Sequence, residues 1–154
     1  MRTALKEEIT TIDDFGVSPA RADDLAFFLA VFYRKHGFAK VNVQYAIESS
    51  DRVRLDINEG PQFMLHTVIF NGNAHEPADK LLNYMVGPTR ERYSSFQKQV
   101  PFVANDLEEG TRLVQRFYLA DGFLDAVVDK PQFDFQSQGT EVDVVMPIHE
   151  GRQY

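Results

Sequence analysis

The side chains in this sequence that could do chemistry are four histidines, several adjacent acids and one asparagine-glycine turn. The histidines show no close ligand spacing, whereas a metal site needs two or three ligands that converge with acids. Adjacent acids on a helix face different ways, and acids near a helix start favour its dipole over acid–base work. We therefore predict surface or structural roles and no metal site. The residues concerned are His36, His66, His75, His149, Asp13-Asp14, Asp23-Asp24 and Glu108-Glu109.

The turn Asn71-Gly72-Asn73 follows an apolar run. It lacks the glycine-rich pattern of a P-loop or a dinucleotide-binding loop, so the prediction is a tight turn that leaves a strand. The sequence offers no set of nucleophile and base. It contains no cysteine, which removes disulfides, thiolate metal ligands and cysteine nucleophiles together. We expect neither catalytic residues nor a cofactor.

The charge balance narrows the partners: 16 Lys and Arg against 23 Asp and Glu give a formal net charge of −7. Nucleic-acid binders need a basic face, and anionic membranes attract basic clusters, so both are disfavoured. No apolar run approaches the roughly 20 residues of a membrane-spanning helix. Met1-Arg2-Thr3 does not open a signal peptide. If the parent protein is exported, we expect this chain to be a fragment of it.

An internal repeat organises the chain. The pattern Phe-Tyr-x-x-x-Gly-Phe at 32–38 recurs at 117–123, which aligns Phe32 with Phe117. Further along each copy, Glu59-Gly60 recurs as Glu150-Gly151. The second copy is slightly longer between these two matches, where we predict a hairpin. Two matches in the same order predict two copies of one structural unit.

Each copy contains a helix that ends at a glycine. Ser18-Pro19 is a helix start in the first copy, and Asn105 with Glu108 forms a capping-box pattern in the second. Gly37 and Gly122 end these helices because glycine accepts the left-handed conformation that closes a helix. The phenylalanine after each glycine is expected to fold back onto the last helical turn.

Alternating apolar and polar residues then predict a two-stranded hairpin in each copy. The second copy also has an opening strand and a short helix that stops at Gly87-Pro88, whereas the first starts directly with a helix and lacks the opening strand. The predicted strands are 41–48 and 53–58 in the first copy, and 64–70, 126–135 and 141–149 in the second. The additional helices are 4–12 and 77–86.

These features resemble POTRA (polypeptide-transport-associated) domains. The likeness rests on Val68-Ile69-Phe70-Asn71-Gly72-Asn73, on the two Phe-Tyr-x-x-x-Gly-Phe segments and on the closing Ile148-His149-Glu150-Gly151. The resemblance implies an α+β fold of two tandem β-α-α-β-β domains, each a three-stranded mixed sheet with two helices on one face. We expect a partial domain at 1–61, without its first strand, and a complete domain at 62–154.

The resemblance also implies a function without catalysis. POTRA domains look like periplasmic arms of barrel proteins in the outer membrane. They bind unfolded outer-membrane proteins and accessory lipoproteins or subunits, beside neighbouring POTRA domains and a C-terminal β-barrel. A scaffold of a cell-division complex uses the same kind of domain, and an unrelated small α+β ligand-binding domain is a further alternative.

The expected binding device is an edge strand, whose unpaired backbone groups can receive an extended client. Our candidate is Ala126-Val127-Val128-Asp129 with Phe133, because Pro131 is tolerated at edges and bulges. Pro147 conflicts with this order, since it falls in a strand placed centrally. Either its missing donor faces an unpaired position or the strand order is wrong.

The long segment between the two helices of the second copy carries Arg90, Arg92 and Lys98. We interpret it either as a solvated linker or as a docking loop for an acidic partner or lipid headgroups.

Overall fold

The computed structural model describes residues 2–93 and 99–154, with side chains from residue 9 onward. The chain divides into two compact units, Met1–Gln62 and Phe63–Tyr154.

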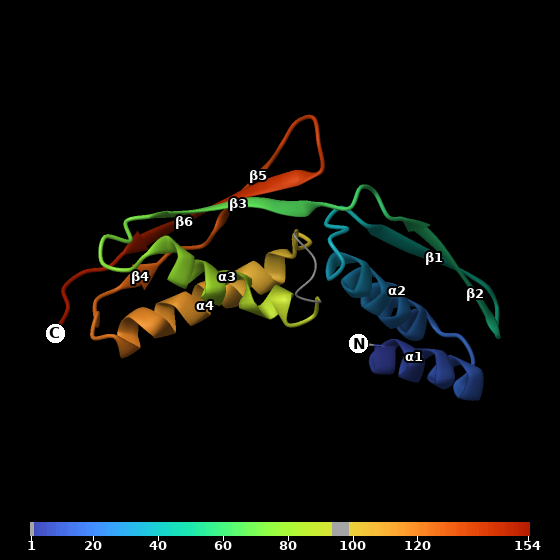
Figure 1. Cartoon of the computed structure of the whole chain (residues 1–154). Coiled ribbons are helices and arrows are strands. Elements are labelled where there is room, and N and C mark those ends of the chain that lie inside the picture. Colours follow the sequence, from blue (N-terminus) through green and yellow to red (C-terminus); the bar gives the residue numbers. More distant parts are fainter. Residues whose placement is uncertain (1, 94–98) are drawn as a thin grey trace. The chain divides into compact units, whose positions relative to one another are not determined.

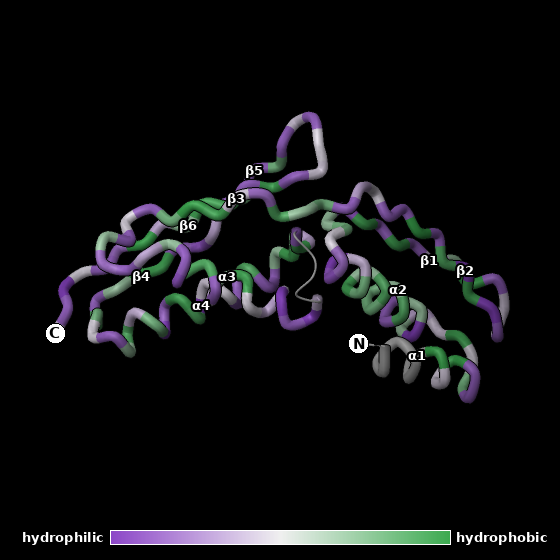
Figure 2. The backbone as a smooth tube through the Cα atoms, viewed as in Figure 1, coloured by the Kyte–Doolittle hydropathy of each residue, from purple (hydrophilic) through white to green (hydrophobic). Residues whose placement is uncertain are grey.

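Unit 1 consists of α1 (Arg2–Phe15), α2 (Pro19–Arg34), β1 (Asn42–Ser49) and β2 (Arg52–Asn58). The two strands form an antiparallel hairpin, and α2 packs against β1 (Figure 1). The α2 helix starts as predicted, because the Ser18 hydroxyl accepts a hydrogen bond from the Arg21 N–H at 3.3 Å. Apolar and polar residues alternate along the hairpin, as Figure 2 shows, so one face of it is apolar.

Unit 2 contains β3 (Met64–Asn71), α3 (Ala78–Arg90), α4 (Ala104–Ala120), β4 (Val127–Val128), β5 (Gln132–Phe135) and β6 (Glu141–His149). The central strand is β6, which pairs in parallel with β3 and antiparallel with β4 and β5 on its other side. Helices α3 and α4 cover one face of this sheet (Figure 1). The residues of β6 that face them, Val142, Val144, Met146 and Ile148, are only 0–3% exposed. The α+β class and the mixed sheet are confirmed.

The predicted glycine closures are also confirmed in both units. Gly37 and Gly122 have φ angles of 91° and 90°. The next residue donates its N–H to the tyrosine carbonyl of the last helical turn, at 3.2 Å for Phe38 and 3.0 Å for Phe123. Each phenylalanine ring also meets the ring of that tyrosine edge to face, with centroids 5.5 and 5.6 Å apart. The repeated sequence segment therefore builds the same helix end twice.

Two predicted boundaries in unit 2 are wrong. Helix α3 does not stop at Gly87-Pro88 but continues to Arg90. Proline in the last turn removes a single backbone hydrogen bond, and the buried Thr89 hydroxyl holds the turn by donating to the Asp106 carboxylate at 2.9 Å. Asn105 does not cap α4, which begins at Ala104 without a side-chain cap.

The strand predicted over 126–135 is interrupted at residues 129–131, which separate β4 from β5. This break explains Pro147. The Pro147 carbonyl accepts the Asp129 N–H at 3.0 Å. Because the N–H and C=O of one strand residue point to the same neighbour, the donor that proline lacks would face the break. The central position of β6 is therefore compatible with its proline.

Candidate functional site

A groove of about 590 Å³ runs between α2 and the outer edge of β1 in unit 1. The groove is open because the α2 residues that face the strand there, Ala26 and Ala30, have small side chains. Phe27 lies at the rim with 58% of its surface exposed. The full lining is Asp23, Ala26, Phe27, Ala30 and Arg34 of α2 with residues 41–45.

The β1 strand turns unpaired backbone toward this groove. Alternate residues of an edge strand direct their N–H and C=O groups away from the sheet. When Phe32 is aligned with Phe117, the counterpart of Val43 is Val128, whose N–H points to α4. Val43 is therefore one of these residues. By the same alternation Tyr45 is another. Within the described residues, no hydrogen bond is made to the groove-facing backbone of Val43 or Tyr45.

The two ends of the groove carry opposite charges. Asp23 lies near the start of α2 and hydrogen-bonds the Tyr45 hydroxyl, which raises the pKa of that tyrosine. Arg34 is the last residue of α2. Arg34 lies eleven positions after Asp23 in the helix, which corresponds to roughly 16 Å at 1.5 Å per residue. An occupant of this length would meet an acid at one end and a guanidinium at the other.

The equivalent groove of unit 2 is only about 150 Å³. It is lined by three residues of α4 and three of the strand region: Glu108, Thr111, Arg112, Val128, Lys130 and Pro131. The same alignment makes the three α4 residues the counterparts of Asp23, Ala26 and Phe27 in α2.

Gln115 closes this second groove. Its side-chain amide donates to the Ala126 carbonyl at 2.6 Å and accepts the Val128 N–H at 2.7 Å. A primary amide placed in this way reproduces the hydrogen bonds of an added strand. The counterpart of Gln115 in the first copy is Ala30, which has no polar side-chain atom to offer. The same edge is thus capped in unit 2 and open in unit 1.

The structure places the predicted edge residues along one side of β6. Val127 and Val128 form β4, and Ala126 just before them is buried. Asp129 lies in the strand break, with its carboxylate 3.6 Å from the His149 ring. Phe133 in β5 packs against Phe102, with ring centroids 4.9 Å apart. Binding of polypeptide here stays a prediction, and Gln115 already occupies two of the backbone groups.

The three residues of the predicted docking loop differ in their surroundings. Arg92 forms an ion pair with the buried Asp106, and its guanidinium also donates to the Pro88 carbonyl at 3.2 Å. Partial burial lowers the pKa of Arg92. Arg90 donates to Asn83 at 3.2 Å on the exposed side of α3, and Lys98 lies outside the described residues. A docking role for this loop remains a prediction.

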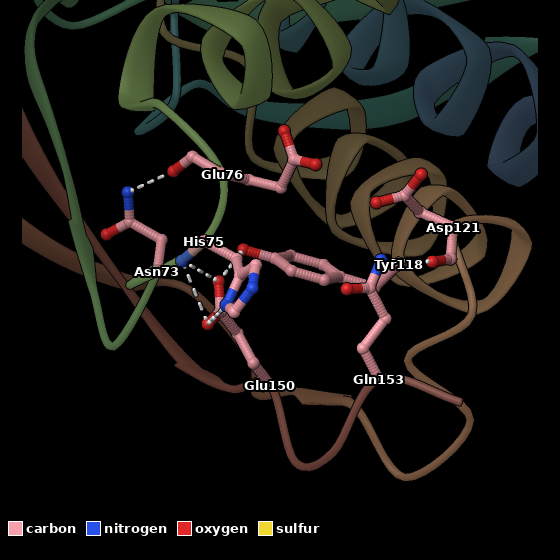
Figure 3. A network of polar contacts seen from close by, with 7 residues as sticks. All are labelled: Asn73, His75, Glu76, Tyr118, Asp121, Glu150 and Gln153. Atoms are coloured by element: carbon pink, nitrogen blue, oxygen red, sulfur yellow. Dashed lines mark hydrogen bonds and ion pairs between the residues drawn. The ribbon is translucent and has the colours of Figure 1, made fainter.

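A buried carboxylate joins three segments of unit 2 (Figure 3). Glu150, which follows β6, accepts the Tyr118 hydroxyl at 2.8 Å and the His75 N–H at 3.0 and 3.1 Å. Burial, with the hydrogen bond to Glu150, raises the pKa of Tyr118. The network fastens the loop after β3 to the ends of α4 and β6. Its partners are a backbone N–H, a tyrosine hydroxyl and, at 3.9 Å, the exposed His75 ring, so we interpret it as a structural clamp.

The sequence pattern that could have found the unit 1 groove is the repeat itself. Aligning the two copies on their Phe-Tyr-x-x-x-Gly-Phe segments places Ala26 against Thr111 and Ala30 against Gln115. The function of Gln115, however, depends on where its amide points, which alternation and helical periodicity do not reveal.

Neither a metal centre nor a membrane helix is found in the part of the chain that the structure describes. Its side chains form no group of three or more His, Cys, Asp and Glu residues that could hold a metal ion. None of its helices is both long and apolar enough to cross a membrane.

Solved structures of similar fold are POTRA-containing proteins. POTRA domains 3–5 of BamA from Haemophilus influenzae match with a TM-score of 0.50 and 16% identity, over 87% of this chain and 50% of that one. BamA from Haemophilus ducreyi lacking POTRA domains 1–3 matches with a TM-score of 0.55 and 13% identity, over 86% and 23%. The chain thus spans half or less of the length of these two proteins. Identities this low show the fold alone.

The comparison by sequence is more specific. No curated protein matches the chain significantly. The family model of POTRA, described as "Surface antigen variable number repeat", matches residues 64–151, which is more than half of the chain. This chain therefore belongs to the POTRA family.

Proposed function

We propose that this chain is a non-catalytic, periplasmic binding module for outer-membrane protein assembly, and that the groove of unit 1 receives extended client polypeptide. Membership of the POTRA family and the fold shared with BamA support the assembly role. The observation that carries the binding site is the contrast between Ala30 and Gln115. One edge has its hydrogen-bonding groups available, and the equivalent edge has them capped.

Strand addition would occur through the backbone of β1. Val43 and Tyr45 each offer one N–H and one C=O to an incoming strand. Each hydrogen bond nets about 0.5–1.5 kcal/mol, so the set contributes about 2–6 kcal/mol before the cost of ordering the client. Because about 4 kcal/mol corresponds to a dissociation constant of about 1 mM, the constant after this cost is about 1 mM or weaker. Binding is thus weak and reversible, as transfer of a client requires.

The groove also predicts which client segments bind best. Backbone hydrogen bonds do not depend on sequence, so many clients are accepted. Side chains that point to Ala26 and Ala30 have room, and apolar ones gain contact with the exposed Phe27 ring. A basic residue suits the Asp23 end and an acidic one the Arg34 end.

Further partners are proposed at the level of the family. The parent protein would carry neighbouring POTRA domains and a C-terminal β-barrel that inserts or translocates the client, and accessory lipoproteins or subunits would dock beside it. The edge formed by Ala126, Val127, Val128, Asp129 and Phe133 is a secondary client site. At its β4 end a client would have to displace Gln115.

The test exchanges the two equivalent residues in the full chain. Affinity for a fluorescein-labelled unfolded outer-membrane protein segment is measured by anisotropy. Ala30→Gln places the capping amide in unit 1 and is expected to weaken binding about tenfold, because an amide that bridges the edge competes for its hydrogen bonds. The matched control Ala30→Ser adds a polar atom that cannot reach the strand and should leave affinity within about twofold. Equal affinity of the Ala30→Gln protein and the wild type would exclude the groove of unit 1 as the client-binding site.

A further inference from the structure

The C-terminal end of α2 carries a cation that the equivalent position of unit 2 lacks. With Phe32 aligned to Phe117, Arg34 corresponds to Leu119, which is 40% exposed. Arg34 lines the groove beside β1, and within the described residues its guanidinium makes no hydrogen bond or ion pair. It is therefore available to an anionic group of whatever occupies the groove.

Two contacts define how α2 and β1 lie along each other. Near the start of α2, the Asp23 carboxylate accepts a hydrogen bond from the Tyr45 hydroxyl. Further along α2, Ala30 is the counterpart of Gln115, whose amide bonds the strand residues equivalent to 41–43. The helix therefore runs antiparallel to β1, with its acidic end beside the middle of the strand and its basic end beside the start of the strand.

Alternate side chains of an added strand would point toward α2. The Tyr45 side chain faces α2, because its hydroxyl bonds Asp23, so by alternation Val43 and Val41 face it as well. Client residues directly opposite these three share their face of the sheet. The client residues opposite Tyr45 and Val41 are four positions apart, or roughly 13 Å. This is close to the span along α2 from Asp23 to Arg34, and long charged side chains can cover the difference.

These positions give the two ends of an added strand different surroundings. In a client strand antiparallel to β1, the residue opposite Tyr45 comes first and the residue opposite Val41 comes four positions later. The first meets Asp23, whose carboxylate can accept more than the one hydrogen bond from Tyr45. The last meets Arg34. A parallel strand would meet the two charges in the reverse order, and parallel pairing is slightly less stable per residue.

We propose, on the basis of the proposed function of this groove, that Asp23 and Arg34 select both the client segment and its direction. The selected segment has a basic residue, an apolar residue two positions later and an acidic residue four positions later, and it binds antiparallel to β1. Its central apolar side chain lies against the Phe27 ring, in the space beside Ala26 and Ala30. Backbone pairing alone would accept either order of charges, so the two charged residues determine the specificity.

The expected preference is moderate and depends on salt. Exchanging the two charges of the segment replaces two exposed ion pairs by two contacts between like charges. This change should weaken binding about fivefold at low ionic strength. Salt screens exposed charges, so the difference should fall below about twofold in about 1 M NaCl. Backbone hydrogen bonds of the same strand do not depend on the order of its charges.

The test compares two peptides of identical composition with blocked ends. One is Gly-Ser-Lys-Thr-Val-Thr-Glu-Ser-Gly, and in the other the lysine and the glutamate are exchanged. Each is titrated into the ¹⁵N-labelled full chain, and the amide shifts of Val43 and Tyr45 give the affinity. The first peptide should bind about fivefold tighter at low salt. Equal affinities at low salt would overturn the proposed selection.

A nitroxide at the N-terminus of the preferred peptide tests the direction. Antiparallel binding places this end beside the later part of β1, so the Ile47 amide should broaden more strongly than the Val41 amide. Stronger broadening at Val41 would show parallel binding and would overturn the proposal.

Variants of the full chain separate this proposal from the groove itself. Arg34→Glu makes both ends of the groove acidic and should remove the preference between the peptides. The matched control Arg116→Glu makes the same charge change on the exposed side of α4 and should keep the preference. A preference that survives Arg34→Glu would overturn the proposal. Ala30→Gln should weaken both peptides. If it does so although the wild type binds both equally, the selection fails and the groove remains, whereas no effect on either peptide would remove the groove.

Discussion

Replacement of Gln115 by alanine tests the idea that this side chain substitutes for a strand. The change removes two hydrogen bonds, of 2.6 and 2.7 Å, to the Ala126 carbonyl and the Val128 N–H. Each nets about 0.5–1.5 kcal/mol. The freed groups regain water at the edge, and alanine favours the helix by a few tenths of a kcal/mol. We therefore expect unit 2 to lose about 1–1.5 kcal/mol.

Urea unfolding followed by the amide signals of β6 measures this loss. With an m-value of about 1 kcal/mol/M, the midpoint should fall by about 1 M. Hydrogen exchange gives the local evidence, because the Val128 amide should lose its protection while amides bonded to β6 keep theirs. The variant Gln115→Glu keeps the acceptor for Val128 but loses the donor for Ala126, so Val128 should stay protected. Unchanged exchange at Val128 in the alanine variant would refute the reasoning.

Three further predictions concern stability and pH. Thr89→Val should cost about 1–3 kcal/mol in urea unfolding, because it leaves the buried Asp106 without one donor; a cost near zero would show that Arg92 alone satisfies this carboxylate. Gly122→Ala should destabilise unit 2 by about 1–2 kcal/mol, since φ is +90° and the new Cβ would lie 2.9 Å from the Tyr154 carbonyl oxygen. Gly87→Ala, within α3 and with open space around it, should instead stabilise unit 2 by up to about 1 kcal/mol. Equal effects of the two changes would contradict the assigned backbone. Asp143 raises the pKa of His66 above its usual 6.5, so the stabilisation by His66 should be full below pH 6.5 and disappear as pH rises through the folded-state pKa; a His66→Gln protein whose urea midpoint differs from that of the wild type by the same amount at pH 5 and pH 9 would rule this out.

The elements of the fold were predictable where local physics decides them. The Ser18 cap, the closures at Gly37 and Gly122 and the alternation in β1, β2, β3 and β6 all follow from the sequence. Tertiary contacts decided the remainder. Gly87-Pro88 would be expected to end α3. The hydrogen bond from Thr89 to Asp106 holds the next turn in place, so α3 continues past this point.

The candidate site was predictable in kind but not in place. An edge strand was expected in the second copy, whereas the equivalent edge of the first copy was not singled out. Which edge is available depends on a single side chain, Gln115 or Ala30, and on the direction in which its amide points. Hydrophobic periodicity carries no information on that direction, so the sequence favoured the edge at Ala126 to Asp129.

The central claim is tested most directly by hydrogen exchange of the β1 amides with and without an unfolded outer-membrane protein segment. Strand addition in the unit 1 groove predicts that the Val43 and Tyr45 amides become protected when the client is added, and that Ala30→Gln abolishes the client-dependent part of this protection. Client binding that leaves both amides exchanging at their free rates would contradict the account.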